Sequence, residues 1–190
     1  MRTLISTAFI SLDGVVEDPG GQSSYRNGGW TFKSVDFVPD AYAIKGSEQE
    51  EATALLLGRV SYQQFSPVWP AMDDFARYKI LPKFVVSTTL TDDELVPEWG
   101  PTTILRSLDD VRTLKETDDG PILVHGSVTL NHALAEADLI DRYNLLVFPL
   151  LLGAGERLFS DADRDAKRLT LVDSEVYSNG IQKNIFDVIH

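Results

Sequence analysis

The sequence predicts an α/β domain with a mostly parallel central sheet, an antiparallel hairpin at the C-terminal end, and helices flanking the sheet. Short apolar runs alternate with amphipathic segments, and this alternation is typical of strands and helices that build a parallel sheet. Residues 168–189 contain two strand-like runs around Asn179-Gly180, a dipeptide that favours a tight hairpin turn. At 190 residues and 43% apolar composition, we expect one domain over residues 1–190.

Local signals along the chain predict the individual elements. Apolar runs bounded by Gly, Ser, Thr or Asp predict strands. Ser107 precedes apolar residues at helical spacing, so it predicts a helix start. A stretch rich in Gly, Ser, Asn and Pro predicts a long loop, and long loops in compact domains are often functional. In chain order we expect a strand over 3–14, a long loop over 17–29, a helix within 39–54, a strand over 54–58, a short helix from 59 that is ended by Pro67, strands over 83–90 and 102–107, a helix over 107–115, a strand over 121–127, a helix over 128–138, a strand from 141 that leads into a glycine-rich loop ending at 155, and two strands over 168–189.

Composition excludes several classes of protein. The formal charge is −12, which argues against a nucleic-acid surface because such surfaces carry clustered basic residues. No cysteine is present, so disulfides, thiolate zinc sites and a cysteine nucleophile are excluded. No window approaches the roughly 18 continuous apolar residues of a membrane span. We therefore expect a cytoplasmic protein with neither a nucleic-acid nor a membrane partner.

Three predicted strands end in the same way. The segments "LLLGRVS", "FVVSTT" and "ILVHGS" each pass from apolar residues into glycine or hydroxyl residues. In open α/β sheets, ligands bind outside the carboxyl ends of the strands, where helix N-termini offer free N–H groups to phosphate. Arg59 adds a guanidinium that matches phosphate oxygens, although a surface salt bridge would explain it equally well. Together the three ends favour a nucleotide site that follows neither the G-x-G-x-x-G nor the Walker pattern.

These segments resemble the dihydrofolate reductase-like superfamily. Two further segments share the resemblance: "SLDGVVEDP" near the start and "LIDRYNLLVFPLLLGAGERLF" near the end. The closer resemblance is to the reductase domain of riboflavin biosynthesis, the RibD C-terminal domain family, as a stand-alone member. The resemblance covers nearly the whole chain. It implies a three-layer fold with a sheet of about eight strands, NADPH as cofactor, a small-molecule substrate and a homodimer.

The resemblance also implies which residues contact the cofactor. Gly58, Arg59 and Ser61 would bind its phosphates, and Ser87 and Thr88 would lie near the adenosine 2′-phosphate. The remaining implied contacts fall into two sets: Gly126, Ser127, Thr129 and Leu130 around the pyrophosphate, and Phe9, Ser11 and Val16 beside the nicotinamide. His125 stands where relatives usually carry a small residue, so it either crowds the cofactor or fills core space.

Two carboxylates are candidates for catalysis. Asp13 follows the first strand and either assists the substrate or caps the turn with Gly14. Asp36 would need burial to raise its pKa and act as a proton donor; the alternative is a solvated loop aspartate. Folate-reducing relatives use a carboxylate on the helix after the loop, and neither Asp36 nor Asp40 aligns with it clearly.

Aromatic residues and a glycine-rich loop are candidates for substrate binding. Trp30, Phe37 and Tyr62 have faces that could stack on a flat heterocycle, although such residues more often belong to the core. Trp69 precedes Pro70, and we assign it to the core. Gly153 either borders the substrate or forms a bend between strands.

No metal site is expected. Residues 161–166 imitate the opening of a calcium-binding loop, but the pattern lacks the glycine and the glutamate that such a loop needs. The three histidines have no ligand-like spacing.

The resemblance implies an NADPH-dependent reductase that acts on a small heterocyclic or ribosylaminopyrimidine-type substrate. The alternatives are a dihydrofolate or pterin reductase, and a non-catalytic nucleotide-binding dimer of the same fold.

Overall fold

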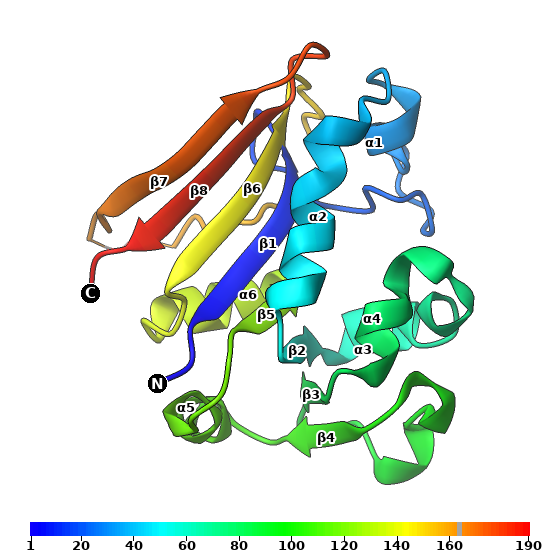
Figure 1. Cartoon of the computed structure of the whole chain (residues 1–190), viewed down its shortest axis with the longest axis vertical. Helices are drawn as coiled ribbons and strands as arrows, with labels where there is room; N and C mark the ends of the chain where they lie inside the picture. The colour runs from blue at the N-terminus through cyan, green and yellow to red at the C-terminus, as the bar shows by residue number, and fades with distance from the viewer. Residues whose placement is uncertain (163–164) are drawn as a thin grey trace.

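The computed structural model describes residues 1–162 and 165–190. Within them the chain forms an eight-stranded sheet in the order β4-β3-β2-β5-β1-β6-β8-β7 (Figure 1). The strands are β1 (Leu4–Ser11), β2 (Ala54–Gly58), β3 (Lys83–Val86), β4 (Thr102–Leu105), β5 (Ile122–His125), β6 (Arg142–Phe148), β7 (Leu169–Val176) and β8 (Gln182–Val188). The strands from β4 to β6 pair in parallel, whereas β8 pairs antiparallel with both β6 and β7. The predicted mostly parallel sheet with a C-terminal hairpin is confirmed.

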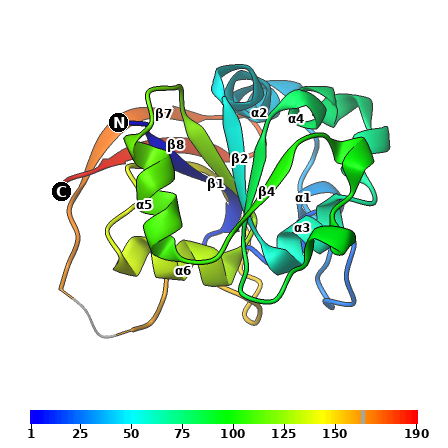
Figure 2. The same cartoon turned by 90° about the horizontal axis from the view of Figure 1, so that it is seen from below.

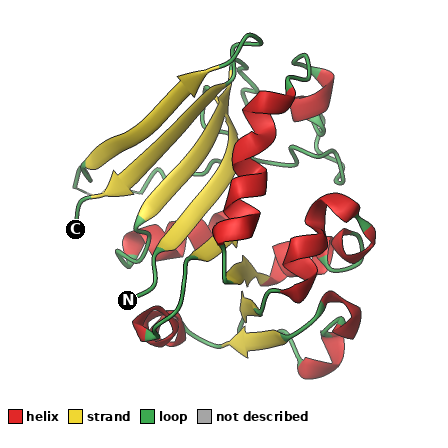
Figure 3. Cartoon of the chain, in the orientation of Figure 1, coloured by secondary structure: helices red, strands yellow, loops and turns green. Residues whose placement is uncertain are grey.

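Helices cover both faces of the sheet, which makes three layers (Figures 2 and 3). They are α1 (Trp30–Lys33), α2 (Pro39–Glu51), α3 (Arg59–Phe65), α4 (Ala76–Ile80), α5 (Leu108–Glu116) and α6 (Val128–Glu136). The described part of the chain also forms four one-turn 3-10 helices: η1 (Trp69–Ala71), η2 (Asp73–Phe75), η3 (Asp92–Glu94) and η4 (Pro97–Trp99).

Each face of the sheet has its own core, because side chains alternate along a strand. On β2, Leu56 packs with α5 and α6 through Val111 and Leu134. Its neighbours Leu55 and Leu57 pack on the opposite face with α3 and α4. A third cluster beneath α1 and α2 joins Trp30 and Ala41 to Phe148 of β6. Since β2 is buried on both faces, its continuous apolar run is the expected pattern for a strand inside a parallel sheet.

The structure shortens several predicted strands, β3 among them, and adds elements that the sequence did not predict. Strand β3 ends at Val86 rather than continuing to Leu90, because the Ser87 hydroxyl accepts hydrogen bonds from the N–H groups of Thr89 and Leu90 and bends the chain. Helices α1 and α4 and the 3-10 turns had no periodic signal in the sequence. Trp69, assigned to the core, is buried as expected.

Within the described residues, no helix is long and apolar enough to cross a membrane. The calcium-loop-like stretch over residues 161–166 includes residues 163–164, which lie outside the described part of the chain.

Candidate functional site

The three predicted strand ends meet at one edge of the sheet. Strand β2 lies between β3 and β5, and Gly58 at its end pairs with Val86 at the end of β3. Ser87 and Gly126 follow β3 and β5 directly. Parallel pairing brings these carboxyl ends together, so residues separated by up to 68 positions form one surface.

Small residues let the end of β2 and the start of α6 approach closely. The Ser127 hydroxyl accepts a hydrogen bond from the Gly58 backbone N–H at 2.8 Å. A Cβ at Gly58 would lie 3.4 Å from Ser127 Oγ, and one at Gly126 would lie 3.0 Å from Ser61 Oγ. Gly126 also has a φ of +66°, which favours glycine. A Cβ at Gly58 would also lie 3.7 Å from Leu130 Cβ, so five of the predicted cofactor residues lie close together.

This arrangement leaves the start of α6 open to an anion. Ser127 occupies the cap position with a left-handed backbone (φ +64°), and its hydroxyl is engaged by Gly58. Within the described part of the chain, no side chain caps the first N–H groups of α6. Helix α5 differs, because Ser107 and Asp110 form a capping box there. Free N–H groups and the helix dipole suit a phosphate, and Thr129 lies exposed in this first turn. The site therefore fits the pyrophosphate of a dinucleotide.

Arg59 lies exposed at the first turn of α3, one residue beyond Gly58. Its guanidinium donates a hydrogen bond to Gln63 Oε1 at 2.9 Å. No carboxylate among residues 1–162 and 165–190 forms an ion pair with it, so the salt-bridge alternative has no support here. Its charge remains available to a ligand.

The turn after β3 carries a basic residue that the sequence analysis missed. Ser87 is buried and its hydroxyl is used within the turn, whereas Thr88 is exposed. Arg106, just beyond β4, donates from Nη1 to the carbonyl oxygens of Ser87 and Leu90 at 3.0 and 2.8 Å. Since β3 and β4 are neighbours, only the pairing of the two strands brings this guanidinium beside Thr88.

Asp13 fastens the loop after β6 to the end of β1. Its carboxylate accepts hydrogen bonds from Ser11 Oγ at 2.6 Å, from the Gly153 N–H at 2.7 Å and from the Leu152 N–H at 3.1 Å. The Ser11 hydroxyl and these backbone donors lower the pKa of Asp13 to about 2. An aspartate that stays ionised at neutral pH is unsuited to donate a proton, and the catalytic role of Asp13 stays a prediction. Its carboxylate also does not cap Gly14 but holds a different loop.

Four further predicted site residues lie at the end of β1 or in the loops beside it, and they differ in burial. Phe9 is half-buried, with edge-on contacts to Tyr42 and Phe148. Ser11 is buried, and its hydroxyl also accepts from the Val15 N–H, so the side chain is used inside the protein. Val16 is half-buried and packs against the core of the α5–α6 face. Gly153 is exposed, with no atom within 4 Å of its Cβ direction.

The structure does not bring the remaining substrate candidates together. Trp30 is 1% exposed and its Nε1–H donates to the Glu17 carbonyl oxygen, while Tyr62 is fully buried and its hydroxyl accepts from the Val96 N–H. Neither ring has a free face for a heterocycle, because core side chains cover both. Phe37 and Asp36 are exposed in the segment before α2, so Asp36 lacks the burial that a proton donor there would require.

His125 fills space rather than crowding an open site. Its ring makes edge contacts with Phe65, Trp69 and Tyr78, at centroid distances of 5.9, 4.9 and 6.1 Å. Its Nδ1 is buried without a hydrogen-bond partner in the described structure. Burial, and to a lesser degree the nearby charge of Lys45, lowers the pKa of His125 to about 3. The imidazole is therefore neutral at physiological pH.

A buried polar cluster beside His125 was also missed by the sequence analysis. Glu48 of α2 is 5% exposed, and its carboxylate accepts from Thr7 Oγ1 at 2.8 Å and from Asn144 Nδ2 at 2.9 Å. Lys45 donates to Glu48 at 3.2 Å and also to the Thr7 hydroxyl. The i,i+3 spacing of Lys45 and Glu48 allows such a pair, but helix α2 has no apolar stripe that would have revealed their burial.

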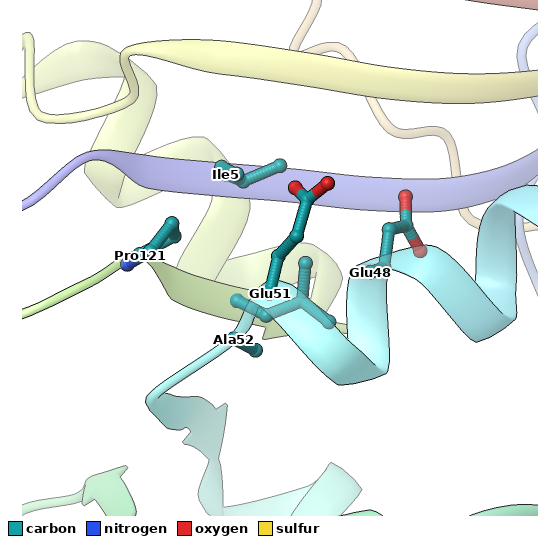
Figure 4. A pocket seen from close by; sticks show the side chains of 6 residues that line it. Ile5, Glu48, Glu51, Ala52 and Pro121 are labelled. Carbon is teal, nitrogen blue, oxygen red and sulfur yellow. The ribbon is translucent and has the colours of Figure 1, made fainter.

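Two hollows border α2. A void of about 10 Å³ lies beneath its C-terminal end beside Glu48 and Glu51, and it is smaller than any substrate (Figure 4). A groove of about 490 Å³ separates α2 from the open face of β6, β8 and β7. Glu48 and Asn144 line its inner wall, and Lys183 and Tyr177 lie on its outer side.

Comparison with known proteins agrees with this architecture. The chain is 22% identical to the uncharacterized protein YyaP of Bacillus subtilis, over 97% of this chain and 94% of that one. Among solved structures it is similar to a putative riboflavin biosynthesis protein from Shewanella sp. PV-4, with a TM-score of 0.76, 22% identity and 99% of each chain covered.

Two reductase-fold structures match at lower identity. Dihydrofolate reductase from Enterococcus faecalis, complexed with NADP(H) and RAB-propyl, gives a TM-score of 0.62 at 12% identity, covering 99% of this chain and 97% of that one. RibD from Acinetobacter baumannii gives 0.64 at 15% identity, covering all of this chain but 59% of the longer RibD chain. These likenesses show the dihydrofolate reductase-like fold. The model of the RibD C-terminal domain matches residues 2–183, and the chain therefore belongs to the RibD C-terminal domain family.

Proposed function

We propose that this chain is an NADPH-dependent reductase of a small heterocyclic or ribosylaminopyrimidine-type substrate. The observation that carries the proposal is the junction of Gly58, Ser61, Gly126 and Ser127, which leaves the start of α6 uncapped at the carboxyl edge of the sheet. Helix N-termini at that edge are the usual place for a dinucleotide phosphate. When bound, NADPH would supply the hydride.

The residues of this chain would hold and orient the cofactor. The first turn of α6, with Thr129 and Leu130, would take the pyrophosphate, while Arg59 and Ser61 would add a cation and a hydroxyl. Thr88 would face the 2′-phosphate with Arg106 next to it. Phe9, on β1, would lie beside the nicotinamide. Most of the rate enhancement would come from positioning, because the hydride chemistry belongs to the cofactor.

Titration of the protein's tryptophan fluorescence with NADPH tests the cofactor assignment. We expect micromolar binding that Arg59→Ala weakens by about tenfold, which is about 1.4 kcal/mol. NADH should bind less tightly than NADPH and respond less to a change at Thr88. Arg77→Ala is the matched control, since this exposed arginine lies on α4, away from the strand ends. Equal effects of the two arginine variants would argue against the assignment.

Turnover separates the candidate functions. NADPH oxidation with a phosphoribosylaminopyrimidine supports the first, and oxidation with dihydrofolate supports a pterin reductase. Tight cofactor binding with neither activity would favour a non-catalytic nucleotide-binding protein.

A homodimer is also proposed, because the family resemblance implies one. Strand β6 is internal and buried, so it is unavailable for subunit contact. Strand β7 is the edge of the sheet and all its residues are exposed, including the apolar Leu171 and Val176. Light scattering after size-exclusion chromatography should give twice the monomer mass of 21.1 kDa.

A further inference from the structure

The Lys45 ammonium lies where a reductase needs a hydrogen-bond donor. It is 5.1 Å from the centre of the Phe9 ring and hydrogen-bonded to the Thr7 hydroxyl. Thr7 and Phe9 are two residues apart on β1, so both side chains project from the face that α2 covers. The proposed function places Phe9 beside the nicotinamide, and Lys45 therefore lies beside the place where a substrate would accept hydride.

Glu48 fixes the position of Lys45. Its carboxylate is directed from α2 toward β1 (Figure 4) and takes hydrogen bonds from three different side chains. The Thr7 hydroxyl donates to Glu48 and accepts from Lys45, so the three groups form a closed triangle. Asn144, on the strand next to β1, holds the other side of the carboxylate.

One donor of Lys45 has no hydrogen-bond partner among residues 1–162 and 165–190. An ammonium has three N–H donors, and Lys45 uses two of them on Thr7 and Glu48. The Lys45 side chain is 15% exposed, in contrast to 4% for Glu48, so it is the less buried member of the pair. His125, the neighbouring titratable side chain on β5, is neutral and adds no second charge. The remaining donor is thus available to a ligand acceptor.

We propose that Lys45 binds and protonates the carbonyl oxygen or imine nitrogen of the substrate, and that Glu48 is its positioning residue. This inference rests on the proposed function. Lys45 gives its proton to the oxygen or nitrogen that receives the π electron pair when hydride adds to the adjacent carbon. Bulk water then returns a proton to the neutral amine. Lys45 thereby takes the role for which the sequence offered only Asp13 and Asp36.

A purely structural explanation makes a different prediction. In that explanation, Lys45 and Glu48 only neutralise each other's charge inside the protein. Replacing both partners of such a pair by neutral groups often leaves the stability of the fold unchanged. Replacing Lys45 alone would leave Glu48 charged and buried without a cation, which risks unfolding. The double variant Lys45→Met/Glu48→Gln removes both charges and keeps the experiment interpretable.

The test uses 6-aminouracil, a flat carbonyl heterocycle, added to the full-length protein loaded with NADP⁺. We expect the wild type to bind the probe and to lower its carbonyl stretching frequency in the infrared spectrum. Lys45→Met and the double variant should lose at least tenfold in probe affinity, about 1.4 kcal/mol, and the frequency shift with it. Lys45→Arg, which keeps a cationic donor, should retain part of the shift. Lys79→Met, at an exposed lysine of α4, is the control and should behave as wild type.

Three results of this experiment would each overturn a specific claim. Unchanged probe affinity and frequency shift in the folded double variant would overturn the role of Lys45. Failure of the wild type to bind 6-aminouracil while NADP⁺ binds normally would overturn it too and leave the cofactor site intact. Failure to bind NADP⁺ would instead overturn the proposed function itself.

Discussion

The Ser127 hydroxyl accepts a hydrogen bond from the backbone N–H of Gly58 at 2.8 Å, across 69 residues of sequence. This contact ties the end of β2 to the start of α6. The same hydroxyl makes no capping hydrogen bond to the helix to which Ser127 belongs. The same bond thus stabilises the junction and leaves the first turn of α6 free for a ligand.

Two substitutions at Ser127 separate the hydroxyl from the backbone conformation. Ser127→Ala removes the hydrogen bond and keeps the left-handed φ of +64°, so we expect a loss of about 1–2 kcal/mol in unfolding free energy. Ser127→Gly removes the same bond but relieves the backbone strain, so it should be about 1 kcal/mol more stable than Ser127→Ala. Urea unfolding of both variants gives the comparison. An alanine variant at least as stable as the glycine variant would contradict this reading.

Replacing Asp13 by asparagine should loosen the loop that carries Gly153. The carboxylate accepts three hydrogen bonds, and we expect a loss of about 1–2 kcal/mol in stability near neutral pH. The pKa of Asp13 is about 2 in the folded protein, below its ordinary value, so its stabilising contribution is complete above about pH 4. It disappears as the pH falls through about 2.

The difference in unfolding free energy between wild type and Asp13→Asn should therefore be smaller near pH 3 than near pH 7. Asp74→Asn, at an exposed aspartate, is the control, and its unfolding free energy should match that of the wild type at both pH values. A gap that widens in acid would be inconsistent with an ionised Asp13.

His125 should make the protein sensitive to acid. Its pKa is about 3 when folded and near 6.5 when unfolded, so between these values only the unfolded chain takes up the proton. Stability then falls with decreasing pH, by at most about 1.4 kcal/mol for each pH unit. His125→Leu removes the titrating group and the buried unpaired Nδ1. From about pH 7 to about pH 5, we expect the variant to lose roughly 2 kcal/mol less than wild type; equal losses would show that His125 ionises freely.

The sequence was sufficient for the sheet and for the strand ends. Strand β2 is predicted at its observed bounds because four apolar residues run into Gly58, and the Ser107 cap marks the start of α5 correctly. Both signals are local. The convergence of Gly58, Ser87 and Gly126 also followed, since carboxyl ends of parallel strands share an edge.

The sequence was insufficient where burial or loop contacts decide the role of a residue. Asp13 and Asp36 look equivalent as loop carboxylates, yet only the fold brings Leu152 and Gly153 against Asp13. Trp30 is buried only because α1 folds onto β6. Lys45 and Glu48 carry no signal of burial in the sequence, because their burial depends on how α2 lies on β1 and β6.

The most direct test of the dinucleotide site is a map of backbone amide shifts in the ¹H–¹⁵N spectrum as NADPH is added. We expect the largest changes at Gly58, Ser61, Gly126, Ser127 and Thr129, with smaller ones at Thr88. The amides of β7 and β8 should remain unchanged. Changes confined to the groove beside β8, or none in a folded sample, would contradict the proposal that the ends of β2, β3 and β5 hold the cofactor.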